Sequence, residues 1–382
     1  MDAAQAQNIP EDRIWAELAH PAVEALLSAG LGGEAAHILV RTSGARGLLE
    51  RRLEELVAVR GLEDAEVQSL AEGLAHLLGD QGDFAGAQRL QRQVLDVRAR
   101  LLGEEHPDTL GSMSNLAETR WAQGDLAGAR RLGERVLRLT TRVLREEHPN
   151  TLTSMNNLAS TIRAQGDFAG ARRLQEQVLD VRQRVLGEEH PDTLTAMNNL
   201  AVTIGAQGDY LGAQRLIERA LEARTRVLGE EHPDTLRSMN NLALTLFAQG
   251  DLAGARRVQE RVVEAGRRVL GEEHPHTMRA VQNLAVTLRA LGDLPGARRL
   301  QERVLEVTRH ELGEAHPNTL AALSNLALLL FESGERETAL HLLRECLIGR
   351  RRVLGESHPD TVATAEFLKR LEAQTDPGPT GA

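Results

Sequence analysis

Hydrophobic residues recur along most of this 382-residue chain with the spacing of amphipathic helices, and the pattern repeats every 42 residues. In the unit that begins at residue 148, Met155, Leu158, Ala159 and Ile162 follow an i, i+3, i+4, i+7 spacing. This spacing places the four side chains on one face of a helix. The first half of the unit therefore predicts a helix with one buried side.

The second half of each unit predicts another helix. Gly166 interrupts the first helix, and a new helical pattern begins near Phe168, with Ala171, Leu174 and Val178 on one face. Steps of 42 residues align the core positions of successive units. One aligned column holds Leu116, Leu158, Leu200, Leu242, Leu284 and Leu326. Another holds Ala129, Ala171, Ala213, Ala255, Ala297 and Ala339, whose small side chains let the paired helices approach closely.

The dipeptide His-Pro marks the start of each unit. It begins at residues 106, 148, 190, 232, 274, 316 and 358. Proline suits the first helical position and its neighbour can cap the helix, while a glycine such as Gly187 suits the preceding helix end. Before His148 the glycine is replaced by Arg145. A fixed period of this length is typical of a solenoid, and seven equivalent histidines argue against seven active sites.

The pattern N-L-A-x6-G-D-[FLY]-x2-A, seen from Asn157 to Ala171, resembles the tetratricopeptide repeat. The 42-residue length and the connection L-G-E-E-H-P-D-T-L resemble the kinesin-light-chain-like branch of that family, although Met or another aliphatic residue replaces the usual tryptophan at the start. The resemblance covers roughly residues 64–373. It implies an all-α, right-handed superhelical solenoid whose first helices line a concave surface.

Three regions are expected. Residues 1–62 lack the 42-residue register and predict a helical N-terminal cap, with a small adaptor region that docks an effector or self-associates as the alternative. Residues 63–373 predict a tetratricopeptide array of seven helix pairs followed by a C-terminal capping helix. Residues 374–382 predict a disordered tail.

Composition narrows the range of partners. The formal net charge of −10 argues against nucleic acid or an anionic membrane surface as a partner. No apolar run is long enough to span a membrane, and the N-terminus has no signal-peptide pattern, so a cytoplasmic location is expected. The only lysine, Lys369, excludes a P-loop, and the only cysteine, Cys346, excludes an internal disulfide or a cysteine-rich zinc site.

The histidines, the cysteine and the local sequence motifs do not indicate a catalytic site. His310 and His316 do not match the H-E-x-x-H spacing of a zinc enzyme, and no nucleophile or dinucleotide motif interrupts the repeats. Cys346 falls in a column of Val and Ala and predicts a buried apolar position. We therefore expect no catalytic residues, no metal and no cofactor; an enzyme would need a site within residues 1–62.

Amides dominate two adjacent columns on the first-helix face opposite the core. They are Asn156, Asn157, Asn198, Asn199, Asn240, Asn241, Gln282, Asn283 and Asn325. One interpretation is that these amides form hydrogen bonds between helices and fix the stacking of units. The other is that they bind the backbone of an extended peptide, which the family resemblance implies for the second column. Both interpretations stay open.

Columns that vary between units are expected to carry specificity, because architecture alone would keep them uniform. One such column contributes Trp121, Arg163, Phe247, Arg289 and Phe331. Another contributes Arg237 and Arg279. Together they predict a groove with arginines and aromatic anchors, suited to an extended segment with acidic and hydrophobic residues. The alternative for Phe247 and Phe331 is packing against the next unit.

These observations predict a non-catalytic protein–protein interaction scaffold that binds an extended acidic and hydrophobic peptide in its concave groove. The alternative is a regulatory or sensor subunit that acts in trans on a larger signalling or effector assembly, since repeats of this branch are often fused to nucleotide-binding modules. Size measurement with and without neighbouring gene products discriminates the two.

Overall fold

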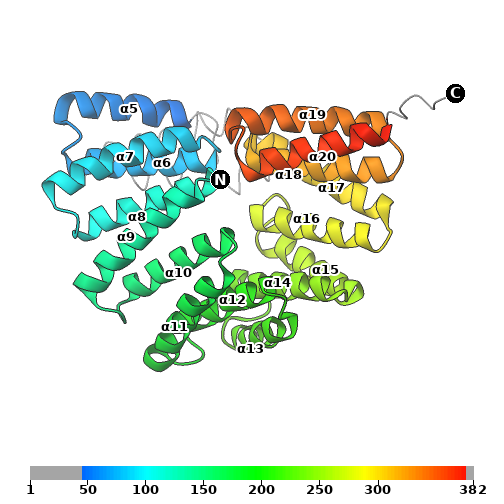
Figure 1. Ribbon diagram of the computed structural model, residues 1–382, viewed down its shortest axis with the longest axis horizontal. Helices are drawn as coiled ribbons and strands as arrows, with labels where there is room; N and C mark the ends of the chain where they lie inside the picture. Colours follow the sequence, from blue (N-terminus) through cyan, green and yellow to red (C-terminus); the bar gives the residue numbers. More distant parts are fainter. Residues whose placement is uncertain (1–44, 376–382) are drawn as a thin grey trace. The chain divides into compact units, whose positions relative to one another are not determined.

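The computed structural model describes residues 45–375, which form sixteen helices, α5 to α20, joined by short turns, and no strand within that range (Figure 1). This confirms the predicted all-α architecture of repeated helix pairs. Residues 1–44 of the predicted cap and residues 376–382 of the predicted tail lie outside the described residues, whereas Gln374 and Thr375 belong to α20. The chain divides into two compact units, Met1–Arg145 and Glu146–Ala382. The limits predicted above for cap, array and tail stay predictions.

The described part of the first unit has five helices. They are α5 (Ala45–Arg60), α6 (Ala65–Asp80), α7 (Phe84–Leu101), α8 (Pro107–Ala122) and α9 (Leu126–Leu144). Helix α5 buries Leu49 and Leu53 against Leu70 and Leu74 of α6, with Val94 of α7 in the same cluster. Apolar burial of this kind is the main source of stability for short helices.

The second unit has eleven described helices. They are α10 (Pro149–Ala164), α11 (Phe168–Leu186), α12 (Pro191–Ala206), α13 (Tyr210–Leu228), α14 (Pro233–Gln249), α15 (Leu252–Val269), α16 (Pro275–Ala290), α17 (Leu294–Leu312), α18 (Pro317–Glu332), α19 (Arg336–Val353) and α20 (Pro359–Thr375). The predicted alanine column is fully buried, and Cys346 is buried in the apolar core as expected. Helix α20, at the place of the predicted C-terminal capping helix, begins at Pro359 and extends to Thr375.

The His-Pro dipeptides begin the first helix of each pair, as predicted. In all seven, the histidine Nδ1 accepts a hydrogen bond from the backbone N–H two residues later, at 3.1–3.2 Å. The histidine thus satisfies one of the N–H groups that a helix start leaves without a partner. In the first pair, where Asp64 stands in place of histidine, its carboxylate accepts from the N–H groups of Glu66 and Val67.

An aspartate caps the N-terminus of the second helix in most of the helix pairs. From the sequence, only an interruption between the two helices of a pair was predicted at this place. The carboxylates of Asp83, Asp125, Asp167, Asp209, Asp251 and Asp293 each accept from a glycine N–H three residues later, at 2.8–2.9 Å. A Cβ on that glycine would collide with the capping carboxylate. In α19 both residues change together, to Glu335 and Thr338, and the side-chain cap is lost.

Glycines end the second helices in a left-handed conformation, as predicted for Gly187, whose φ is 93°. Arg145 takes this place at the end of α9 with φ 75° and ψ 169°. It is the only non-glycine residue with positive φ between residues 45 and 375. It is also the last residue of the first compact unit.

Candidate peptide-binding surface

The two amide columns bond to one another between successive first helices of the second unit. Asn241 Nδ2 donates to Asn198 Oδ1 at 3.4 Å, and Asn283 Nδ2 donates to Asn240 Oδ1 at 2.9 Å. Asn198 is 3% exposed and also donates to Leu194 O and to Ser238 Oγ. Its amide is therefore used within the molecule, which supports the stacking interpretation at this position.

Other amides keep accessible polar groups. Asn157 is exposed, whereas Asn199, Gln282 and Asn325 are half-buried. The Oδ1 atom of Asn156 is buried and accepts no hydrogen bond from the described residues. The predicted set thus separates into amides that join neighbouring units and amides that face solvent.

Arg237 and Arg279 lie on successive first helices of the second unit, beside a cavity of about 80 Å³. The cavity also contacts Asn240 and His276, and Leu236, Val262 and Leu270 provide apolar wall. Both arginines are exposed. Arg237 pairs with Asp234 at 3.0 Å, and Arg279 donates to Nδ1 of His276 at 3.0 Å. Two guanidinium groups with free N–H donors therefore converge on one opening.

The electrostatics of this opening are positive. Burial lowers the pKa of His276, and the nearby charges of Arg279, His274 and Arg237 act in the same direction. Burial also lowers the pKa of Arg224 to about 10, with Arg237 adding to the shift and Asp234 opposing it. Both shifts come first from burial, which disfavours any charged form, and then from Arg237 and, at His276, Arg279 and His274, whose charges disfavour a further positive charge.

A column of arginines that are buried or half-buried was not predicted from the sequence. Arg98, Arg182, Arg224 and Arg350 extend from second helices and donate to the backbone carbonyl ten residues later. Arg224 is 1% exposed and also donates to Ser238 Oγ and Thr195 Oγ1. Gly266 occupies the same column and lines the cavity beside Arg237. The 42-residue alignment contains this signal, because Arg224 and Gly266 are one period apart.

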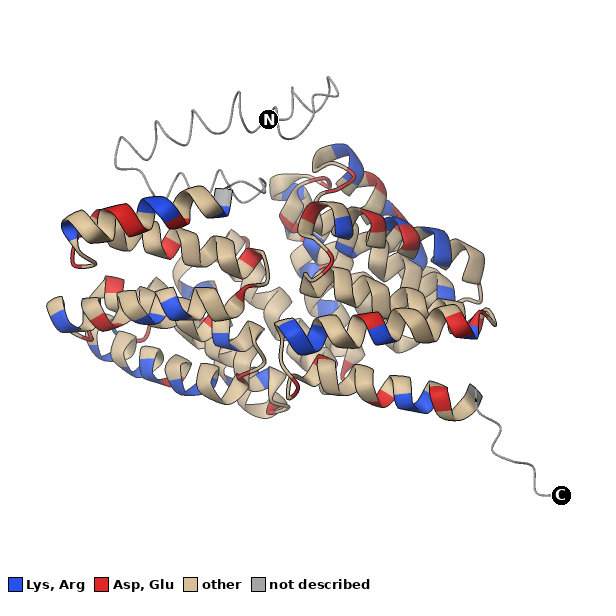
Figure 2. Ribbon diagram, turned by 90° about the horizontal axis from the view of Figure 1, so that it is seen from above, with Lys and Arg blue, Asp and Glu red and all other residues tan. Residues whose placement is uncertain are grey.

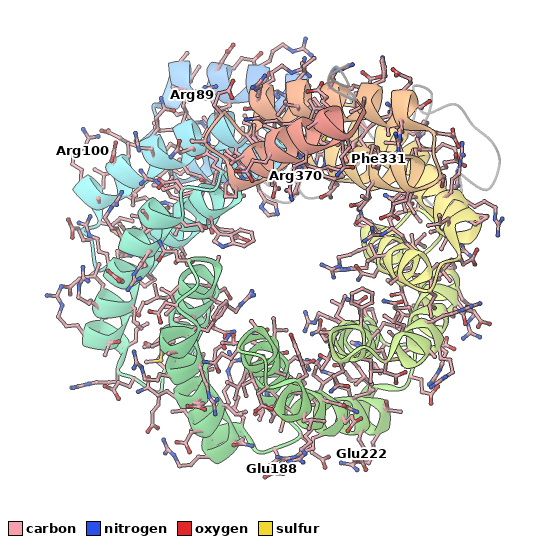
Figure 3. All side chains as sticks on the ribbon, turned by 45° about the vertical axis from the view of Figure 1, so that its right-hand side comes forward. Arg89, Arg100, Glu188, Glu222, Phe331 and Arg370 are labelled. Atoms are coloured by element: carbon pink, nitrogen blue, oxygen red, sulfur yellow. The ribbon has the colours of Figure 1, made fainter. Side chains whose placement is uncertain are left out.

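The predicted aromatic positions of the second unit are partly packed. Phe331, on α18, packs against the apolar cores on both sides of it, and the Arg336 guanidinium lies 5.7 Å from its ring centroid (Figure 3). Phe247 is half-buried. Arg289 pairs with Glu332 at 2.7 Å. These contacts favour the packing interpretation for Phe331. Leu244, on α14, is an apolar side chain that is 43% exposed.

Two further predicted positions lie nearer the N-terminus. Trp121, at the end of α8 in the first unit, is 45% exposed. Arg163, on α10 in the second unit, is half-buried, and this burial lowers its pKa. Arg163 forms no ion pair among residues 45–375. Basic and acidic residues are interspersed along the helices of both units in the view of Figure 2.

No group of three or more His, Cys, Asp or Glu side chains between residues 45 and 375 has the arrangement of a metal site. In the same part of the chain, no helix is long and apolar enough to cross a membrane.

Comparison with protein families identifies the repeats. Models described as tetratricopeptide repeat match residues 66–142, 151–192, 199–267, 241–310 and 277–347, which together exceed half of the chain. None of the curated proteins matches the chain.

Solved structures show the same architecture. A putative kinesin light chain of Podosopora anserina with nearly identical TPR-like repeats is 32% identical, with a TM-score of 0.45 over 54% of this chain and 97% of that one. BtubC (BKLC) from P. vanneervenii is 28% identical, with a TM-score of 0.49 over 60% and 92%. The apo form of RapI is 11% identical, with a TM-score of 0.53 over 75% and 98%, which shows a shared fold.

Proposed function

The chain belongs to the tetratricopeptide repeat family, and we propose that it is a non-catalytic scaffold that binds an extended, acidic and hydrophobic segment of a partner protein. The segment lies on the first-helix face of the second unit. The observation that carries this proposal is the pair Arg237 and Arg279 beside the cavity at Gly266. The match to tetratricopeptide repeat models agrees with a protein-binding role.

The arginine pair suits carboxylates for geometric reasons. Each guanidinium has five N–H donors, and the internal contacts, from Arg237 to Asp234 and Thr195 and from Arg279 to His276, use only part of that capacity. Carboxylates accept such donors in short, charge-assisted hydrogen bonds. Leu244 and the half-buried Phe247 and Val286 offer apolar contact on the same series of first helices. An extended segment with acids near a hydrophobic residue meets both kinds of surface.

The test uses fluorescent twelve-residue peptides with a central Leu or Trp flanked by Asp and Glu, compared with the same peptides carrying Asn and Gln. We expect the acidic set to bind and the double variant Arg237→Glu, Arg279→Glu to abolish binding without loss of helix content. Circular dichroism checks the helix content and fluorescence anisotropy the binding.

The control variant is Arg256→Glu with Arg298→Glu. It makes the same change in net charge at second-helix positions whose arginines pair with Glu260 and Glu302. Binding of the acidic peptides should persist in this control. Equal binding by the Arg237, Arg279 variant would exclude the proposed surface.

A further inference from the structure

A larger cavity, of about 440 Å³, lies in the first unit between α6, α7 and α8. Its wall includes the carboxylates of Glu72, Asp80 and Glu118, the amide of Gln91 and the ring of Phe84. None of the residues that line it is Lys or Arg. The cavity therefore has the opposite charge to the opening beside Arg237 in the second unit.

The repeat pattern itself leaves this space open. Gly73 occupies a column of the 42-residue repeat that is asparagine in each of the next six repeats, from Asn115 to Asn325. Gly79 occupies the column of Trp121, and a Cβ at Gly79 would meet no atom within 4 Å. Two side chains that fill the equivalent surface elsewhere are thus absent from the wall of this cavity.

Three carboxylates lie around the cavity, together with Ser69, His76, Gln91, Asn115 and Thr119, whose side chains can both donate and accept. Glu118 is exposed and forms no ion pair among the described residues. Glu72 accepts from Arg98 at 2.6 Å and from Ser112 at 2.9 Å, and Asp80 lies 3.7 Å from His76. The Gln91 side chain is 8% exposed, and its Oε1 accepts no hydrogen bond from residues 45–375. A buried acceptor without a donor costs free energy, at Gln91 as at the aligned Gln175 and Gln259, and at Gln91 the adjoining cavity gives a ligand room to supply the donor.

We propose that this cavity binds an arginine side chain of a partner polypeptide. A guanidinium brings five N–H donors to a wall that holds three carboxylates and no Lys or Arg, and Glu118 and Gln91 provide one charged and one neutral acceptor. The aliphatic stem and the planar head can both pack on an aromatic ring, which Phe84 supplies. This site goes beyond the acidic-peptide surface of the second unit and takes a ligand of opposite charge.

The test measures binding of the fluorescent peptide Gly-Ser-Gly-Arg-Gly-Ser-Gly to the full chain by anisotropy, beside peptides with citrulline or lysine at the central position. Citrulline keeps the shape of arginine and removes its charge. We expect arginine to bind best, lysine more weakly and citrulline at least about tenfold more weakly than arginine, because citrulline lacks the positive charge and carries an acceptor oxygen in place of one NH2 donor.

Two variants locate the site. Glu118→Gln removes a charge at an exposed position, and Gly73→Asn introduces the asparagine that the next six repeats carry at this position. Both variants should therefore fold. Each should raise the Kd of the arginine peptide about tenfold or more. Failure of the arginine peptide to bind, equal binding of the citrulline peptide, or equal affinity in both variants would each overturn the proposal.

Binding measurements on the variants of both sites distinguish this proposal from the proposed function of the second unit. The double variant Arg237→Glu, Arg279→Glu should keep its affinity for the arginine peptide. Glu118→Gln should keep its affinity for the acidic peptides. Loss of arginine binding in the Arg237, Arg279 variant would contradict the location in the first unit.

Discussion

One position of the repeat holds Arg98 in the first unit, whereas in the second unit it holds arginine at residues 182, 224 and 350 and glycine at residue 266. In the first unit, Arg98 of α7 extends beside the first helices and bonds to Glu72 and Ser112. Four periods later, in the second unit, this position is Gly266, and a cavity remains with Arg237 and Arg279 at its edge. A buried guanidinium contributes to stability, whereas an exposed guanidinium beside an empty space is available to a partner.

The columns that line the two cavities also differ in charge. Ser69 and Glu72 of the first unit align with Arg237 and Asn240 of the second. The surrounding core columns stay leucine and alanine in both. The comparison therefore shows that one apolar framework can present either sign of charge, because the lining positions face away from the core.

The largest expected effect is on stability and concerns the buried arginines. Arg224→Leu should lower the free energy of unfolding by about 3 kcal/mol, because Ser238 and Thr195 lose a partner and the backbone carbonyl of Asp234 loses its donor. Arg98→Leu should cost a similar amount, because it leaves Glu72 without its ion pair. Urea unfolding measures both.

Matched controls lie two residues away on the same helices. Arg100 and Arg226 are exposed and pair with Glu63 and Glu189 of the preceding connections. Arg100→Leu and Arg226→Leu should each cost less than about 1 kcal/mol, since exposed ion pairs contribute little. Equal losses at buried and exposed positions would show that burial of the column is not what stabilises it.

The next effect concerns the end of the first unit. Arg145→Gly should raise the free energy of unfolding by about 1–2 kcal/mol, because φ 75° with ψ 169° is a region that only glycine adopts without strain. Gly187→Ala, at φ 93° and ψ 166° in the second unit, should lower it by a similar amount. Urea unfolding of the two variants against the parent chain checks the opposite signs.

Local sequence patterns were sufficient to predict the helix pairs. Helical periodicity, His-Pro and Gly187 act over a few residues, so the helix starts and the core columns followed from the sequence. The capping role of Asp167 and its partner Gly170 was not recognised, although the Gly-Asp break was. The cap and its glycine are three residues apart, as in Asp167 and Gly170. This Asp-x-x-Gly spacing is present in the sequence, but its role in capping is recognised only from the structure.

Contacts between helices were harder to predict. Arginine is normally exposed, so nothing local indicates that Arg224 is buried; its partners come from α12 and α14. A column of asparagines also does not reveal that Asn283 donates to Asn240 of the preceding 42-residue repeat, whereas Asn157 is exposed to solvent. Those outcomes depend on the distance between neighbouring first helices, which the periodicity does not specify.

A smaller effect separates the two interpretations of the amide columns. Asn283→Ala should lower the free energy of unfolding by about 1 kcal/mol, because Asn240 Oδ1 loses its donor. Asn157→Ala should change it by less than about 0.5 kcal/mol, since this side chain is exposed. If Asn157→Ala also weakens binding of the acidic peptides, the solvent-facing amides contact the partner. Equal stability losses would show that both amides serve stacking.

The smallest expected effect is a shift in the titration of His276. Burial lowers the pKa of this imidazole below its ordinary value of 6.5, and Arg279, His274 and Arg237 lower it further. Asp234, on α14, is the acidic residue that lines the same cavity. Between the lowered pKa and about 6.5 the unfolded chain binds more protons than the folded chain. The contribution of His276 to stability is therefore lost as the pH falls through this window.

NMR titration of the imidazole resonances measures the sign directly. Arg279→Gln removes the charge that donates to His276 Nδ1, so the pKa of His276 should rise in this variant. Arg289→Gln, at an ion pair with Glu332 further along α16, should leave it unchanged. A pKa that stays the same in Arg279→Gln would mean that the arginine does not face the imidazole, and the positive opening of the second unit would then lack one of its two guanidinium groups.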